Sequence, residues 1–145
     1  MSLEIGKFFI KALNANSALV SAAGGRIFPV ARTTEDEQLD KIPYIIMQPE
    51  GLTNEGQSKD DAEGDTDLCN VSLLVCSSSY QDLVTLTQSV RQTIHEAFLN
   101  GISDVTWSFA IDGYDFSADA VNYDPQKPCH WQTLRYTIYT HNYGN

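Results

Sequence analysis

Residues 66–100 constrain the fold of this chain more than any other segment, because they combine a buried strand with a long helix. The strand part is almost continuously apolar, and Val71, Leu73 and Val75 alternate on one side of it. Such a run is typical of a central strand that is covered on at least one face. We therefore expect this strand to lie in the middle of a sheet.

A long amphipathic helix is predicted directly after this strand. Ser78 and Gln81 have the spacing of a capping box, so a helix should begin at serines 77–79. Its apolar stripe repeats every three or four residues and comprises Leu83, Leu86, Val90, Ile94 and Ala97 or Phe98. Asn100 and Gly101 should end the helix, since both tolerate the left-handed backbone of a helix terminus. Nothing in this unit resembles a catalytic motif.

The rest of the chain predicts a second helical region and several further strands. We expect a kinked helix over 3–23, an extended piece over 26–30, an acidic surface loop over 31–41, and strands over 44–48, 105–112 and 131–139. Asp112-Gly113 is a turn signal, and residues 114–123 should return as a short strand or an irregular segment. The predicted fold class is α+β, with a single antiparallel or mostly antiparallel sheet of four to five strands and two amphipathic helices packed on one face.

Length and charge restrict the possible functions. The 145 residues suit one domain over 1–145, and an apolar fraction of 42% argues for a packed core. Nineteen acidic residues against nine basic ones give a net charge of −10, which opposes binding of nucleic acid through its phosphates. We also expect no signal peptide and no transmembrane segment. The sequence thus predicts neither specific nucleic-acid binding nor membrane binding.

Acidic residues are concentrated in residues 50–67, where the composition changes sharply. Glycines and carboxylates alternate there, which predicts a long mobile loop between two strands. Its acidic side chains are candidate interaction residues: Glu55, Asp60, Asp61, Glu63, Asp65 and Asp67. Trp131 and Tyr139, with Leu74, should lie on the sheet face away from the helices. Because apolar side chains on an open face often mark a binding surface, Trp131 and Tyr139 are also candidate interaction residues.

Catalytic and metal-binding patterns are not found in the sequence. Cys69, Cys76 and Cys129 form no even framework, so we expect reduced thiols in a cytosolic setting. Serines 77–79 lack the glycines of a nucleophile elbow, and Cys129-His130 has no second pair at zinc spacing. The acidic segment also lacks the ligand pattern of an EF-hand. We predict no catalytic residue, no cofactor and no metal, and hence no enzyme.

The order of these elements resembles that of the tail-completion, or tail-terminator, proteins of long-tailed bacteriophages and prophages. The likeness rests on the helix end Ala22-Ala23-Gly24-Gly25-Arg26-Ile27-Phe28-Pro29, the strand start Ile42-Pro43-Tyr44-Ile45-Ile46, the passage 71–90 with Ser77-Ser78-Ser79-Tyr80 and Ser89-Val90-Arg91, and the last strand Tyr136-Thr137-Ile138-Tyr139. It covers nearly the whole chain in order. The sequence departs from the family pattern in 50–67 and 114–127.

The resemblance implies a structural role in a virion. Proteins of this family form a ring, usually a hexamer, that caps the tail tube, stops tube growth and offers a joining surface to the head. The implied partners are other copies of the chain, the tail tube protein and a head-side connector protein, with assembly in the host bacterial cytoplasm and a final place in the virion tail. The alternatives are another head-tail connector or tail tube subunit, an acidic protein-binding module, and, last, a small hydrolase.

The acidic segment should face the channel or the next ring if this resemblance holds. A negative channel repels DNA and so lets it pass without binding. Neutralising Asp60, Asp61, Glu63 and Asp65 together should leave folding intact but reduce genome passage or head-tail joining, measured as infectious particles per assembled tail. The alternative is that the segment only solubilises the surface, and normal infectivity of this variant would favour that alternative.

Overall fold

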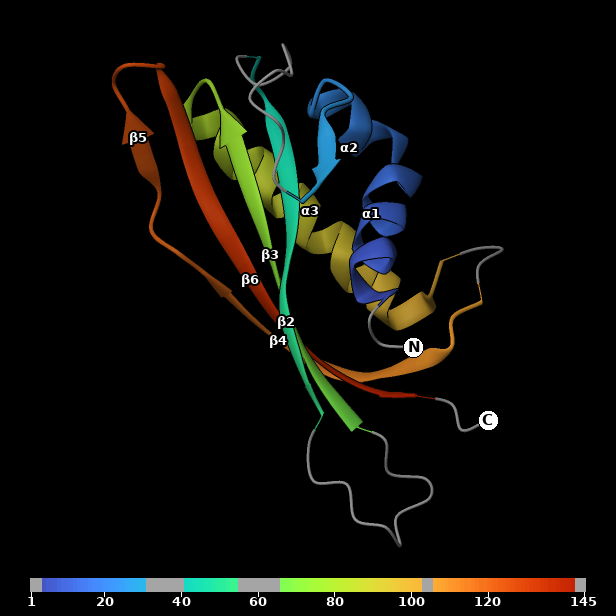
Figure 1. The fold of residues 1–145 in the computed structure, drawn as a ribbon. Coiled ribbons are helices and arrows are strands. Elements are labelled where there is room, and N and C mark those ends of the chain that lie inside the picture. The colour runs from blue at the N-terminus through green and yellow to red at the C-terminus, as the bar shows by residue number, and fades with distance from the viewer. Residues whose placement is uncertain (1–3, 31–40, 55–65, 103–105, 143–145) are drawn as a thin grey trace, which may run out of the picture.

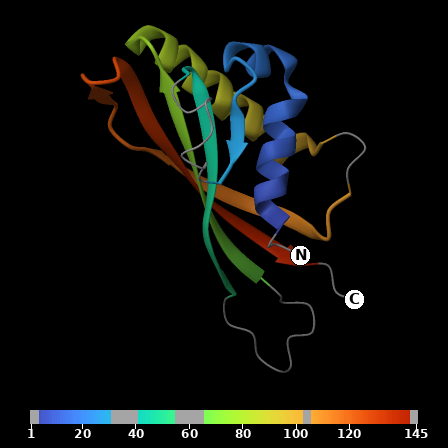
Figure 2. The same cartoon turned by 45° about the horizontal axis from the view of Figure 1, so that its top comes forward.

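A computed structural model describes residues 4–30, 41–54, 66–102 and 106–142 of the chain. Within these residues, three helices lie on one side of a six-stranded sheet, and both views in Figures 1 and 2 show the other face without a helix. The elements in chain order are α1 (Ile5–Ala15), α2 (Ser17–Ala22), β1 (Ile27–Pro29), β2 (Tyr44–Asn54), β3 (Thr66–Ser77), α3 (Tyr80–Asn100), β4 (Phe109–Ala118), β5 (Asn122–Asp124) and β6 (Cys129–Asn142).

The sheet confirms the α+β class but is mixed and has more strands than predicted. Its order is β1-β2-β3-β6-β4, with β5 paired to β6 beside the end of β4. All pairs are antiparallel except β1 and β2, which are parallel. Backbone hydrogen bonds from Ile45 to Arg26 and from Val30 to Met47 hold β1 against β2. The predicted extended piece at 26–30 is therefore a sheet strand, which the sequence alone did not reveal because its partner lies beyond the 31–41 segment.

Helix boundaries follow from side-chain caps. The predicted kink in the first helical region is at Asn16, whose side-chain oxygen accepts a hydrogen bond from the Leu19 amide at 3.2 Å and begins α2. The cap of α3 is Ser79 rather than the predicted Ser78, because the Ser79 hydroxyl accepts from the Asp82 amide at 3.1 Å. Gly101 follows α3, which ends as predicted, with a positive φ of 73° that favours glycine, but its ψ of −174° lies outside the predicted left-handed region.

The core lies between the three helices and one face of the sheet. Val71, Leu73 and Val75 are buried there, as the alternation in β3 predicted. The buried residues of α3 are Leu83, Leu86, Thr87, Val90, Ile94 and Ala97, which confirms the predicted stripe. Aromatic rings fill the space between α1, α3 and β6, since Phe9 packs within 6 Å of the rings of Phe98 and Tyr136. Helix and sheet are thus joined mainly by apolar contact.

Both strands flanking the β3–β6 pair contain a bulge, and each bulge adds an acidic residue. In β2 the pairing shifts between Pro49 and Gly51, so Glu50 is the extra residue, and Gly51 takes a φ of 137° that favours glycine. In β4 the pairing shifts between Ile111 and Gly113, which makes Asp112 the extra residue. The predicted Asp112-Gly113 turn is therefore wrong, because the strand continues through it.

Three strand boundaries differ from the prediction. β2 extends to Asn54 and β3 begins at Thr66, so residues 50–54 and 66–67 of the predicted loop belong to strands, and residues 55–65 lie outside the described residues. β4 covers 109–118 rather than 105–112, and β5 supplies the short strand expected in the return. β6 begins two residues before and ends three residues after the predicted 131–139. In each case pairing with a neighbouring strand sets the strand boundary, which therefore differs from the boundary indicated by the local apolar pattern.

Phe9 should contribute strongly to stability, because its ring is fully buried between α3 and β6. The substitution Phe9→Ala should lower the free energy of unfolding by about 3–5 kcal/mol. Urea unfolding followed by circular dichroism would measure the change. Leu99→Ala is the matched control, because Leu99 is 68% exposed on α3 and its loss should change stability by about 0.5 kcal/mol or less. Similar losses in both variants would contradict this packing.

Candidate functional site

The sheet face without helices is the candidate interaction surface. Trp131 and Tyr139 both lie on this face of β6, as predicted, with Trp131 half-buried and Tyr139 36% exposed. Eight residues separate them along the strand, which corresponds to about 26 Å. The two aromatic residues therefore do not form one patch. The stretch between them on this face of β6 carries Thr133, Arg135 and Thr137 and is polar.

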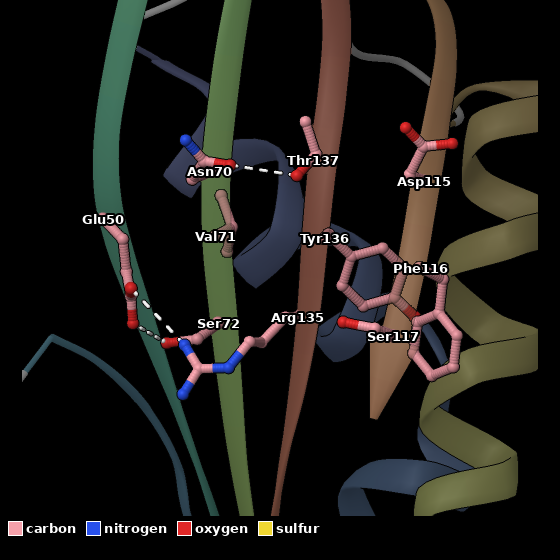
Figure 3. A pocket seen from close by; sticks show the side chains of 10 residues that line it. All are labelled: Glu50, Asn70, Val71, Ser72, Asp115, Phe116, Ser117, Arg135, Tyr136 and Thr137. Carbon is pink, nitrogen blue, oxygen red and sulfur yellow. Dashed lines mark hydrogen bonds and ion pairs between the residues drawn. The ribbon is translucent and has the colours of Figure 1, made fainter. Parts of the chain in front are cut away.

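Arg135 is the centre of a polar network on this stretch (Figure 3). Its guanidinium makes a two-point contact with the Asp119 carboxylate, with Nη2 to Oδ2 at 2.9 Å and Nε to both oxygens at 3.1 Å. Nη1 also lies 3.6 Å from Glu50 Oε2, and Ser72 donates its hydroxyl to the other Glu50 oxygen at 2.6 Å. The bulge at Glu50 aims that carboxylate at Arg135, so the network joins β2, β3 and β6 to the segment after β4.

This network surrounds a shallow hollow of about 250 Å³ on the sheet face. Its walls include Asn70, which accepts a hydrogen bond from the Thr137 hydroxyl at 3.0 Å, and Asp115, which accepts one from Tyr139 at 2.6 Å. The Arg135 hydrogen bond lowers the pKa of Asp119, and Asp119 in turn raises the pKa of Arg135. Both groups are charged and paired at neutral pH.

The acidic candidates are only partly placed by the structure. Five of them lie outside the described residues: Glu55, Asp60, Asp61, Glu63 and Asp65. Asp67 is 4% exposed, and its oxygens accept hydrogen bonds from Asn54 at 2.7 Å and Asn142 at 2.8 Å. Its predicted place in a surface loop is therefore wrong. Asp67 ties the ends of β2, β3 and β6 together, since a buried carboxylate requires such partners.

The three histidines lie in three separate settings. His95 on α3 pairs with Tyr114, and His141 on β6 pairs with the Asp112 carboxylate at 2.8 Å. The ring of His130 packs between Tyr80 and Tyr123, at 6.4 and 4.8 Å from their ring centroids. Within the described residues, no three His, Cys, Asp or Glu side chains come together as a metal site would require.

The cysteines and serines of the sequence analysis have structural roles here. Cys69, Cys76 and Cys129 are buried and form no disulfide, and burial raises the pKa of Cys69. Ser79 caps α3. None of the helices in the described part is both long and apolar enough to cross a membrane.

Sequence reasoning missed the network around Arg135. One signal was present, since an arginine alternating with Thr133 and Thr137 in a strand must face away from Leu134 and Tyr136. Its partners Asp119 and Glu50 could not be identified, because one follows a weakly patterned strand and the other lies in a bulge. Only strand pairing brings these distant residues together.

Comparison with known proteins shows similarity in fold. No family model and no curated protein sequence matches the chain. Among solved structures, 36 chains match, including a chain from the virion of a native gene transfer agent particle. That chain aligns over 94% of both proteins with a TM-score of 0.68 and 12% sequence identity. The likeness therefore covers the whole arrangement of helices and strands but not the individual side chains.

The Asp119–Arg135 pair should make stability depend on acidic pH. Because the folded-state pKa of Asp119 lies below its ordinary value of 3.8, the pair contributes stability above that value and loses it as the pH falls through the folded pKa. Asp119→Asn should therefore flatten the fall of the melting temperature between about pH 5 and pH 2. Thermal unfolding across this range would measure it.

Glu96→Gln is the matched control for this substitution. Glu96 is exposed on α3 and accepts a hydrogen bond from neutral Gln92 at 3.2 Å. An equal flattening in both variants would show that the Asp119–Arg135 pair is not the source of the pH dependence.

Proposed function

We propose that this protein is a virion subunit that caps a phage or prophage tail tube as a ring, stops tube growth and forms the head-tail joining surface. The observation that carries the proposal is the fold shared with a gene transfer agent virion chain over 94% of both proteins. The order of sequence elements, which resembles that of tail-completion proteins, supports the narrower role. The proposed partners are other copies of the chain, six in a ring by analogy with that family, a tail tube protein and a head-side connector protein.

The sheet has edges that suit a head-to-tail ring. β4 forms one edge in the described part of the chain, and residues 48–54 of β2 extend beyond β1 at the opposite edge. A closed ring of identical subunits needs two different surfaces on each copy, one for each neighbour. Two unlike edges of a single sheet meet that requirement. The face without helices, with its Arg135 network, is then free to contact the tube or the connector.

The net charge supports passage of DNA without binding. At −10 per subunit, a ring of this chain repels phosphate at every approach, and repulsion prevents the genome from adhering to the lumen. The same charge is compatible with an acidic module that binds a basic protein. Such a module would bind a cationic partner in solution with strong salt dependence and would have no affinity for tail tubes.

Electron microscopy of induced lysates, with and without the gene, tests the proposal. Loss of a tube-capping subunit should give overlong tubes or unattached tails beside full heads, because nothing stops tube growth or joins the head. Complementation with the wild-type gene should restore tails of uniform length joined to heads.

Two other outcomes would direct the assignment elsewhere. Complete absence of tubes would indicate a tube subunit, since tube proteins polymerise without limit and build the tube itself. Normal tails joined to heads in the deletion strain would exclude a tail-end role and favour the acidic binding module.

A further inference from the structure

A second polar pocket lies between α3 and β4, on the helix side of the sheet. It has a volume of about 360 Å³, and its lining residues are Gln88, Arg91, Gln92, His95 and Tyr114. All but Tyr114 are exposed on α3, whereas Tyr114 is half-buried on β4. Each of the five carries at least one hydrogen-bond donor, and none is acidic. In a chain with a net charge of −10, this is an unusual concentration of donors.

Arg91 is held in position but has no carboxylate partner in the described part of the chain. Its guanidinium carbon lies 4.3 Å from the centre of the Phe116 ring, a cation–π contact that fixes the side chain. Arg135, by contrast, is already paired with Asp119 and Glu50. Because a guanidinium can donate two parallel hydrogen bonds to one carboxylate, the Arg91 side chain is suited to bind a carboxylate group.

His95 and Tyr114 complete the pocket opposite Arg91. The Tyr114 hydroxyl lies 2.5 Å from His95 Nδ1, and the Tyr114 ring packs 4.5 Å from that of Phe98. A neutral imidazole that accepts from Tyr114 carries its proton on Nε2, which makes this nitrogen a donor. Behind them, the Tyr136 hydroxyl is buried without a hydrogen-bond partner among the described residues. The pocket therefore offers several donors beside the Arg91 cation and no carboxylate among its lining residues, although the Gln92 amide already donates to Glu96 at 3.2 Å.

We infer that this pocket binds a carboxylate side chain from a second copy of this chain, with Arg91 as the charged contact and His95 and the glutamines as further donors. The inference rests on the proposed ring and identifies one of its contacts. Two copies that each carry −10 repel each other, so a stable contact between them requires a cation that faces an acidic side chain.

The position of the pocket favours a neighbouring copy as the source of that carboxylate. It lies beside β4, which is one of the two sheet edges that have no partner strand in the described residues. A chain that pairs with this edge passes its side chains over α3 within reach of Arg91. Nineteen acidic residues in each copy supply the complementary charge.

Carbodiimide coupling of the Arg91→Lys variant tests this inference directly. Lysine keeps the positive charge and adds an amine that a carbodiimide joins to a carboxylate in contact with it. A mixture of ¹⁴N- and ¹⁵N-labelled protein, coupled and digested, would show by mass spectrometry whether the bond joins two copies. We expect mixed-isotope peptides that link position 91 to an Asp or Glu, and a large loss of this product at about 1 M salt, where the Debye length is about 3 Å.

Coupling at Lys11 measures the level of non-specific cross-linking in the same experiment, because Lys11 is an exposed lysine on α1. As a second variant, Arg91→Ala should weaken self-association about tenfold or more in sedimentation velocity, whereas Lys11→Ala, with the same charge change, should leave it unaltered. Links at position 91 that do not exceed those at Lys11, in purified protein and in particles alike, would overturn the inference. So would links within one copy or to another virion protein.

These outcomes are independent of the gene-deletion phenotype. Intermolecular links at position 91 together with normal tails in the deletion strain would retain the pocket and reject the tail-end function. Absence of these links together with overlong tubes in the deletion strain would reject the pocket inference and retain the tail-end function.

Discussion

The pairing of β3 with β2 on one side and β6 on the other is the constraint on which the rest of the structure depends. β3 is paired with β6 along its whole length and with β2 over most of it, and its inward side chains belong to the same core cluster as those of α1 and α3. A strand bonded on both sides and covered on one face leaves little freedom of register, because a shift of one residue would expose Val71 and Leu73 to water. The helices can then pack on one face only, which leaves the other face for contacts with other molecules.

Two arginines on opposite sides of this sheet have different electrostatic settings. Arg135 lies on the open face and is satisfied by Asp119 and Glu50, so it fixes the shape of that surface. Arg91 lies on the helix side, rests on Phe116 and belongs to a pocket of donors. In an acidic chain a cation that already has carboxylate partners organises the subunit itself. A cation without a carboxylate partner is better placed to join the subunit to another molecule.

Elements with strong local patterns could be predicted, and those that depend on pairing could not. The alternation in β3 and the stripe of α3 gave the correct faces, because burial acts on residues close in sequence. The β1–β2 pair, the continuation of β4 through Gly113 and the buried position of Asp67 all depend on distant strands. On the candidate surface, too, the features set by local pattern were predicted and those set by strand pairing were not. Trp131 and Tyr139 were placed on the correct face, but the polar network between them was not foreseen.

The two bulges also bear on how copies of this protein can add to one another. Glu50 and Asp112 interrupt the regular hydrogen-bond ladder in β2 and β4, and their carboxylates turn to Arg135 and His141 on neighbouring strands. A flat, regular edge would accept a neighbour in several registers and continue without limit, as fibrils do. An edge interrupted by a bulge admits few alignments with a neighbouring strand and adds local twist. These irregularities therefore disfavour the regular edge-to-edge pairing that builds an open fibre.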